Sequence, residues 1–344
     1  ERALRFAMML QWLAHRQLAE ADAEARAAGL TLGFYRDLAV GCAPDGAEVW
    51  GAGNLLMRRV SVGAPPDPLG PQGQVWSLPP PNPLAQAAAG FAPFAELIRA
   101  NMAHAGALRI DHVLGLRRLF VVPDGMSGAE GAYVDQPFED LLGQLALESH
   151  AAKCLVVGED LGTVPWGFKE RMAEARVLSY QVVWFEREGE GFRSPAHYPH
   201  LGAACVATHD LPTLAGWWAA TDLAENLALG RIDAAAFARE SEARDREKRV
   251  MLDTLVAAGR LSPAEDEEAD PTALTPEIAA AIHAFVASGA SALCLVQADD
   301  MAGEAERLNL PGTDRERPNW RRRLGPTLPD LFRSEEHTSE LQSH

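Results

Sequence analysis

Short apolar runs that end in charged or polar residues constrain the fold of this chain more than any other feature. Their lengths of about 5–8 residues and their β-branched side chains predict strands rather than helices. They cover residues 30–38, 107–111, 154–159, 180–185, 204–210 and 292–297. Stretches with helix-like apolar spacing lie between them, at residues 92–104, 137–152 and 276–288. Strand followed by helix, repeated along the chain, predicts βα units and a parallel sheet.

The residues at the strand ends indicate which kind of parallel sheet this is. An open, doubly wound sheet usually has a glycine-rich phosphate-binding turn after its first strand, and the sequence has no GxGxxG or P-loop pattern. Three strands instead deliver the ionisable residues Asp111, Glu159 and Asp210. A (β/α)8 TIM barrel keeps its active site at the carboxyl ends of its strands. We therefore predict an α/β fold of the TIM-barrel type.

The predicted barrel is incomplete in this sequence. Six strands are predicted, whereas a closed barrel of this type needs eight. The chain opens with Glu1 rather than Met, inside a helical pattern that runs to about residue 29. We expect an N-terminally truncated barrel that lacks its first strands, with residues 1–333 forming the C-terminal part of one catalytic domain. Residues 334–344 resemble a translated sequencing adapter, and we expect them to be a non-native tail.

The net charge of −17 argues against nucleic acid or an anionic membrane as the main partner, because phosphate binding needs a basic face. The sequence has no apolar stretch of membrane-spanning length and no signal-peptide pattern. None of its four cysteines forms a CxxC pair, which favours free thiols in a reducing compartment. Together these features predict a cytoplasmic protein that acts on a neutral substrate.

Residues 63–83 are dense in proline and glycine (GAPPDPLGPQGQVWSLPPPNP). Such a segment is not expected inside a helix or a central strand, because proline lacks a backbone N–H and both residues weaken regular structure. The segment is predicted to be a long ordered loop or a disordered linker. Long loops inside compact domains are often lids or binding loops.

The strand ends carry a constellation suited to glycosidic bonds. Side chains alternate along a strand, so Arg109 and Asp111 share one face, opposite the apolar Leu108 and Ile110. Retaining cleavage of a glycosidic bond needs a carboxylate nucleophile and a protonated carboxyl about 5–5.5 Å apart. Arg109 would keep Asp111 ionised, while burial would raise the pKa of the second carboxyl.

Two other interpretations of these carboxylates stay open at this point. Each carboxylate could be a helix cap or part of a surface ion pair. The three could also hold a divalent metal, as in other barrel enzymes. Arg109, two residues before Asp111 on the same face, counts against a cation there, and we expect neither a metal nor a cofactor.

The chain resembles the amylomaltases of glycoside hydrolase family 77, of the larger bacterial type, over about residues 1–333. The most specific matches are RIDH, GEDLG and THDLPT, in this order and spacing. Further matches are GFYRDLAVG, AEVW, VGAPPD, GQVW, GAYVDQPFEDLLGQLALES and LNLPGTDRERPNWRRRL. The resemblance implies a 4-alpha-glucanotransferase. Such an enzyme transfers a glucan segment from a donor to an acceptor, each an α-1,4-glucan or maltooligosaccharide.

The resemblance also implies a role for each matching residue. Asp111 of RIDH matches the nucleophile, Glu159 of GEDLG the general acid/base, and Asp210 of THDLPT the transition-state stabiliser. The substrate-binding residues that match are Arg109, His112, His209, Trp76 and Asp67. Residues 63–83 match the loop on the acceptor side, where Trp76 would be a stacking platform unless it only packs within the loop. His112 and His209 could likewise be structural histidines.

The resemblance predicts a retaining double displacement that ends in transfer rather than hydrolysis. An α-amylase-like hydrolase would use the same carboxylates and differ in its products. A metal-dependent lyase or isomerase on a barrel would depend on a divalent cation. An inactive glucan-binding fragment is the third alternative, because a barrel without its first strands cannot close.

Overall fold

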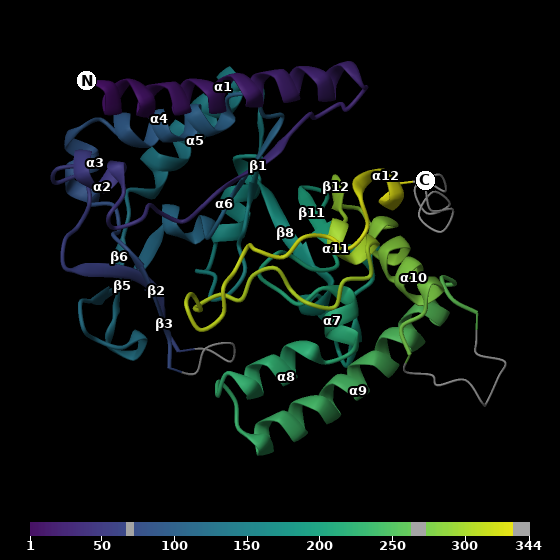
Figure 1. The fold of residues 1–344 in the computed structure, drawn as a ribbon. Helices are drawn as coiled ribbons and strands as arrows, with labels where there is room; N and C mark the ends of the chain where they lie inside the picture. Colours follow the sequence, from purple (N-terminus) through teal and green to yellow (C-terminus); the bar gives the residue numbers. More distant parts are fainter. Residues whose placement is uncertain (67–71, 263–272, 333–344) are drawn as a thin grey trace. The chain divides into compact units, whose positions relative to one another are not determined.

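A computed structural model describes residues 1–66, 72–262 and 273–332 of the chain. The chain divides into two compact units, Glu1–Tyr180 and Gln181–His344, called here the first and second unit. Each unit is described by itself. Figure 1 shows the course of the chain and the helix and strand labels used below.

The first unit contains a parallel sheet in the order β1-β4-β7-β8. Its strands are β1 (Tyr35–Leu38), β4 (Ala107–Ile110), β7 (Leu155–Gly158) and β8 (Leu178–Val182), the last of which ends just past the boundary. Helices separate these strands in sequence, which is the βα alternation that the apolar runs predict. The strand predictions for residues 30–38, 107–111, 154–159 and 180–185 are confirmed in kind, although every strand is shorter or shifted by a few residues.

Three helices of the first unit, those within residues 1–29, 92–104 and 137–152, confirm the predicted helical stretches, and three shorter helices were not predicted. The helices are α1 (Arg2–Ala27), α2 (Ala47–Gly51), α3 (Pro83–Ala88), α4 (Ala92–Met102), α5 (Phe138–Ala152) and α6 (Phe168–Glu174), with short 3-10 turns η1 (Val113–Leu116) and η2 (Gly128–Glu130). Helices α4 and α5 pack against each other (Figure 1). Helix α1 buries none of its residues.

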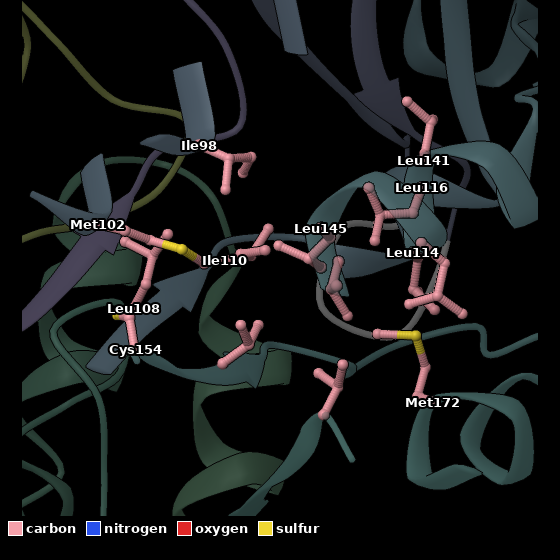
Figure 2. Close-up of a cluster of buried hydrophobic side chains, with 14 of the residues drawn as sticks. Ile98, Met102, Leu108, Ile110, Leu114, Leu116, Leu141, Leu145, Cys154 and Met172 are labelled. Atoms are coloured by element: carbon pink, nitrogen blue, oxygen red, sulfur yellow. The ribbon is translucent and has the colours of Figure 1, made fainter. Parts of the chain in front are cut away.

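A hydrophobic core joins the parallel sheet to its helices. Figure 2 shows Leu108 and Ile110 of β4 in one cluster with Ile98 of α4 and Leu145 of α5. Both β4 residues are almost fully buried, and each such side chain contributes about 1.5–3 kcal/mol. Because the apolar pair faces the helices, Arg109 points to the opposite face of the strand, as the alternation predicts.

The first unit also contains an antiparallel sheet that the sequence analysis does not predict. Its order is β3-β2-β5-β6, with β2 (Val60–Ala64), β3 (Gln74–Leu78), β5 (Arg118–Pro123) and β6 (Ala132–Asp135). The prediction that residues 63–83 form a loop or linker throughout is therefore wrong at Gly63, Ala64 and the whole of β3. The prolines of this segment suggest a loop, but they lie between the two strands or after the second. They therefore remove no hydrogen bond from the sheet.

Gly63 shows why glycine can stand inside the central strand β2. A Cβ atom at this position would lie 2.1 Å from the carbonyl oxygen of Gln74 on β3. The register between the two strands shifts at the same point, between Val62 and Gly63. Only glycine allows the two backbones to approach this closely, so its presence marks a bulge rather than a loop.

The second unit contains the parallel pair β11 (Gly202–Cys205) and β12 (Leu293–Leu295), which confirms the two remaining strand predictions in kind. Its other elements are η3 (Val183–Phe185), β9 (Arg187–Glu188), β10 (Gly191–Phe192), η4 (Pro195–His197), α7 (Leu214–Trp218), α8 (Thr221–Ala228), α9 (Ala234–Ala257), α10 (Pro276–Ala287), α11 (Ala298–Met301) and α12 (Leu328–Leu331). Arg244 of α9 forms a buried bidentate pair with Asp222 of α8, with both N–O distances 3.0 Å.

Two predictions fall partly or wholly outside the described residues. Asp67 lies outside them, and so does the expected tail at residues 334–344. None of the four cysteines, all of which the structure describes, forms a disulfide, and Cys154 and Cys205 are buried. In the described ranges, no helix is both long and apolar enough to span a membrane.

Candidate active site

Asp111 and Glu159 each follow directly after a strand of the parallel sheet. The N–H of Asp111 donates to the carbonyl of Leu38 at 2.9 Å, and the N–H of Glu159 donates to the carbonyl of Ile110 at 3.0 Å. The first bond extends the pairing of β4 with β1 by one residue, and the second extends that of β7 with β4. Both carboxylates therefore start from fixed backbone positions at the carboxyl edge of the sheet.

Arg109 links the carboxylates of Asp37 and Asp111 on the face of the sheet opposite the hydrophobic core. Its side chain is only 5% exposed, and its Nη1 and Nη2 each lie 2.8 Å from a carboxylate oxygen, of Asp37 and Asp111 respectively. The guanidinium also lies over the ring of Tyr180, 5.6 Å from its centroid. Burial opposes the positive charge, but Asp111 and Asp37 outweigh it and raise the pKa of Arg109. This buried cation favours the ionised form of Asp111.

The environment of Glu159 favours its protonated form, in contrast to that of Asp111. Its Oε2 accepts the N–H of His112 at 2.9 Å, and its Oε1 accepts the N–H of Leu161 at 2.8 Å. Burial raises the pKa of Glu159 to about 7; the charge of Asp111 adds to this rise, while the two backbone donors and Arg109 oppose it. Near neutral pH this carboxyl can therefore both hold a proton and release it.

His112 and Trp76 form an aromatic contact beside these carboxyls. The backbone of His112 adopts a left-handed conformation (φ 47°, ψ 56°), which turns the chain immediately after Asp111. Burial lowers the pKa of the imidazole to about 4, so it is neutral at pH 7. The Trp76 ring meets it edge to face at 5.2 Å, and the indole N–H donates to the Gln74 side chain at 3.0 Å.

The second unit carries the third carboxylate, in the loop between β11 and α7. Asp210 accepts a hydrogen bond from Asn309 Nδ2 at 2.6 Å through Oδ1, and its Oδ2 lies 3.1 Å from His209 Nε2. Its backbone N–H donates to the buried Thr208 hydroxyl at 3.2 Å. The His209 ring also contacts Trp320, with centroids 5.3 Å apart. His209 and Asp210 are thus held as one local unit.

The predicted site residues are placed as follows. The first unit brings together Arg109, Asp111, His112, Glu159 and Trp76. His209 and Asp210 lie together in the second unit, so their convergence with the other two carboxylates stays a prediction.

Two residues that contact the predicted site, Asp37 and Asn309, are not among the predicted ones. Asp37 lies in the quoted GFYRDLAVG stretch, and it pairs in register with Arg109 across β1 and β4. Asn309 lies in the quoted LNLPGT stretch and donates to Asp210. Both could have been noted as polar residues within matching motifs, but their partners depend on the fold.

The electrostatics of the first unit suit acid/base chemistry with a nucleophile. One carboxylate lies against a buried guanidinium, while its neighbour has a raised pKa. The guanidinium of Arg109 offsets the negative charges of Asp37 and Asp111, so these two carboxylates need no metal cation between them. In the described residues, no three His, Cys, Asp or Glu side chains are grouped so that they could hold a metal ion.

Comparison with known proteins decides the family. The model of glycoside hydrolase family 77, described as 4-alpha-glucanotransferase, matches residues 1–328. The chain belongs to this family. A curated 4-alpha-glucanotransferase from Haemophilus influenzae is 38% identical over 332 residues, which cover 96% of this chain and 48% of that relative. The family resemblance drawn from the motifs is thus confirmed.

Solved structures of the family have the same fold. The crystal structure of amylomaltase from Corynebacterium glutamicum matches with a TM-score of 0.90 at 36% identity, over 97% of this chain and 49% of that chain. Amylomaltase from Streptococcus agalactiae in complex with acarbose matches with a TM-score of 0.70, over 96% of this chain and 60% of that chain; at 20% identity it shows the fold alone. The chain spans about half the length of the curated relatives it matches.

Proposed function

We propose that this chain carries the nucleophile and the acid/base of a 4-alpha-glucanotransferase that acts on α-1,4-glucans. The observation that supports the proposal is that two neighbouring carboxyls have opposite electrostatic environments: one lies beside a cation, and the other is buried with a raised pKa. Arg109 stabilises the ionised form of Asp111, while burial keeps a proton on Glu159 up to about pH 7. A retaining glycosidase mechanism needs this division between nucleophile and acid.

The first half of the reaction forms a covalent intermediate. An Asp111 carboxylate oxygen attacks the anomeric carbon, and the bond from that carbon to the glycosidic oxygen breaks. Glu159 gives its proton to the departing oxygen, so the leaving glucan departs with a free 4-hydroxyl. The donor part stays on Asp111 as a glycosyl ester.

The second half reverses these steps with an acceptor. Ionised Glu159 takes the proton from the 4-hydroxyl of an incoming glucan, and this oxygen attacks the anomeric carbon. The ester bond to Asp111 breaks, an α-1,4 bond forms, and both carboxyls return to their starting states. Transfer exceeds hydrolysis when the acceptor keeps water away from the intermediate.

The remaining assignments belong to the same proposal. Asp210 is proposed to stabilise the transition state, with His209 beside it, and its contact with Asn309 supports a fixed orientation. His112 and Trp76 are proposed to contact substrate, as is Asp67. Residues 63–83 are proposed to serve the acceptor side. The edge-to-face contact of Trp76 with His112 supports a place for it near Asp111.

We further propose that the whole enzyme folds as a (β/α)8 barrel and acts in the cytoplasm. The parallel strands β1, β4 and β7, each with its ionisable or polar residues at the carboxyl edge, support the barrel. Residues 1–333 would belong to its catalytic domain, and residues 334–344 would lie outside it. Neither nucleic acid nor a membrane is proposed as a partner.

Covalent trapping on this chain tests the mechanism. The Glu159→Gln variant is incubated with α-maltotriosyl fluoride, whose leaving group needs little protonation, and the digested protein is analysed by mass spectrometry. We expect a maltotriosyl ester on the peptide that contains Asp111, and none in an additional Asp111→Asn variant. Asp124→Asn, which changes an exposed aspartate of the first unit, is the matched control. A label on another residue, or no label, overturns the assignment.

The products from maltotriose distinguish the rival activities. A transferase releases glucose together with longer maltooligosaccharides, whereas an α-amylase-like hydrolase produces reducing ends without longer products. A glucan-binding fragment binds maltotriose without either result. Equal turnover by the wild-type chain and Asp111→Asn would remove Asp111 from the mechanism, and sensitivity to a chelator would favour a metal-dependent enzyme.

A further inference from the structure

The second unit contains a pocket of about 720 Å³ that no step of the proposed reaction uses. Its walls come from α7, from Lys248 of α9, from the first two turns of α10 with the residues just before it, and from α11 with the residues that flank it. The volume falls within the range of about 300–1,000 Å³ that is typical of small-molecule sites. None of the predicted site residues lines it.

Asp300 lines this pocket with a half-satisfied carboxylate. Its side chain is 1% exposed, and its Oδ1 accepts the N–H of Leu214 at 2.7 Å. Its Oδ2 makes no hydrogen bond within the part of the chain that the structure describes. The ring Nε2 of His283 lies 3.7 Å away, too far for a hydrogen bond.

The negative charge of Asp300 has no positive partner close enough to offset its burial. Burial raises the pKa of Asp300 to about 6, so the carboxyl is still largely ionised at pH 7. Burial also lowers the pKa of His283 to about 4, so the imidazole is neutral and supplies no countercharge. A buried acceptor without a donor destabilises the folded chain, and more so when the acceptor is charged. A ligand that brings a donor to Oδ2 would recover this free energy.

Lys248 supplies the opposite kind of group to the same pocket. Its side chain is 10% exposed, and its Nζ lies 2.9 Å from Asp245 Oδ1, which uses one of three ammonium donors. The pocket therefore offers an acceptor at Asp300 and further donors at Lys248. Leu214, Pro276 and Met301 add apolar surface to the lining.

The combination selects among ligand classes. An anion would be repelled by Asp300, whose charge has no close partner, and a simple cation offers no acceptor for the remaining ammonium donors of Lys248. A neutral molecule with several hydroxyl groups can donate to the carboxylate, accept from the ammonium and lay its C–H faces on the apolar wall. A pyranose ring has all three properties.

We propose that this pocket is a second carbohydrate-binding site, which takes a glucose unit of an α-glucan with a sugar hydroxyl donating to Asp300 Oδ2 and Lys248 donating to a sugar oxygen. The choice of an α-glucan rests on the proposed function of the chain, whereas the polyhydroxylated class follows from the pocket alone. Such a site would hold a glucan chain through residues that take no part in the proposed reaction.

Local binding is measured with maltotriose on the Asp111→Asn chain, which prevents turnover. Fluorine NMR of fluorotryptophan-labelled protein reports on Trp218, a pocket-lining residue, after assignment of its signal with Trp218→Phe. We expect the Trp218 signal to shift with maltotriose. Asp300→Asn keeps an acceptor for the Leu214 N–H but loses the charge, and we expect it to weaken this binding about tenfold or more.

Two further variants keep the result interpretable. Ala280→Phe fills the pocket from a partly exposed wall while Asp300 itself stays unchanged, and it should also abolish the shift. Asp253→Asn, which changes an exposed aspartate of α9, should bind like its parent. Thermal unfolding of each variant shows whether it is folded. Unchanged binding in folded Asp300→Asn and Ala280→Phe overturns the proposal, as does a Trp218 signal that maltotriose does not move.

The two proposals fail separately. Covalent labelling of Asp111 without binding at Trp218 refutes only the second site. Binding at Trp218 that Asp300→Asn removes, in a chain that never labels at Asp111, refutes the mechanism and leaves the second site standing.

Discussion

Replacing Glu159 by glutamine should make the stability of the first unit less sensitive to pH. The pKa of Glu159 rises from 4.5 to about 7 on folding, chiefly through burial. Below pH 4.5 the carboxyl is protonated in the folded and the unfolded chain, so folding carries no penalty. As the pH rises from 4.5 to about 7 the unfolded chain ionises first, and stability falls until the loss is complete above the folded pKa.

The size of this effect follows from the pKa difference. A rise from 4.5 to about 7, at about 1.4 kcal/mol per pH unit, corresponds to about 3 kcal/mol of lost stability above neutral pH. Glutamine is neutral at every pH and avoids this loss. It can accept only one of the two backbone N–H bonds, of His112 and Leu161, which costs about 1–3 kcal/mol at all pH values.

The free energy of unfolding in urea, measured from about pH 4.5 to about pH 8 for both proteins, tests this reasoning. The stability of Glu159→Gln relative to wild type should increase by about 3 kcal/mol across this range. Glu96→Gln is the control, because Glu96 is an exposed glutamate on α4. A relative stability that stays constant, or that decreases as the pH rises, would refute a buried Glu159 carboxyl with a raised pKa.

Three further changes test the same geometry. Asp111→Asn removes a charge that raises the pKa of Glu159, so carbon NMR titration should find that pKa below about 7; an unchanged value contradicts the coupling. Arg109→Met leaves Asp111 without its buried cation, so it should slow labelling by α-maltotriosyl fluoride at least about tenfold. It should destabilise the fold by only about 1–3 kcal/mol, because the Asp37 and Asp111 side chains are partly exposed to solvent. Labelling at the wild-type rate would show that the pair is dispensable. Gly63→Ala should destabilise the first unit by several kcal/mol in thermal unfolding, because its Cβ would lie 2.1 Å from the Gln74 carbonyl oxygen; a melting temperature equal to wild type would show that β2 and β3 are farther apart.

Local sequence patterns were sufficient to predict the parallel strands and the acidic residues that follow them. The alternation in ALRID places Arg109 opposite Leu108 and Ile110 whatever the rest of the chain does, and the structure has this arrangement. The antiparallel sheet was missed because β2 and β3 lie in a segment whose prolines and glycines suggest a loop. Strands β2 and β3 can be assigned only from their hydrogen bonds to neighbouring strands, which the local sequence does not reveal.

The amino-acid sequence by itself determined the family, the α/β alternation and which acidic residues follow the strands, because these depend on residue order and local periodicity. Tertiary structure alone decided that Asp37 meets Arg109, that Glu159 keeps a proton near neutral pH, and that Asp300 faces a pocket. The physical reason is that hydrogen-bond partners and desolvation are set by segments far apart in the chain. A side chain's identity fixes its chemistry, while its neighbours fix the state in which it works.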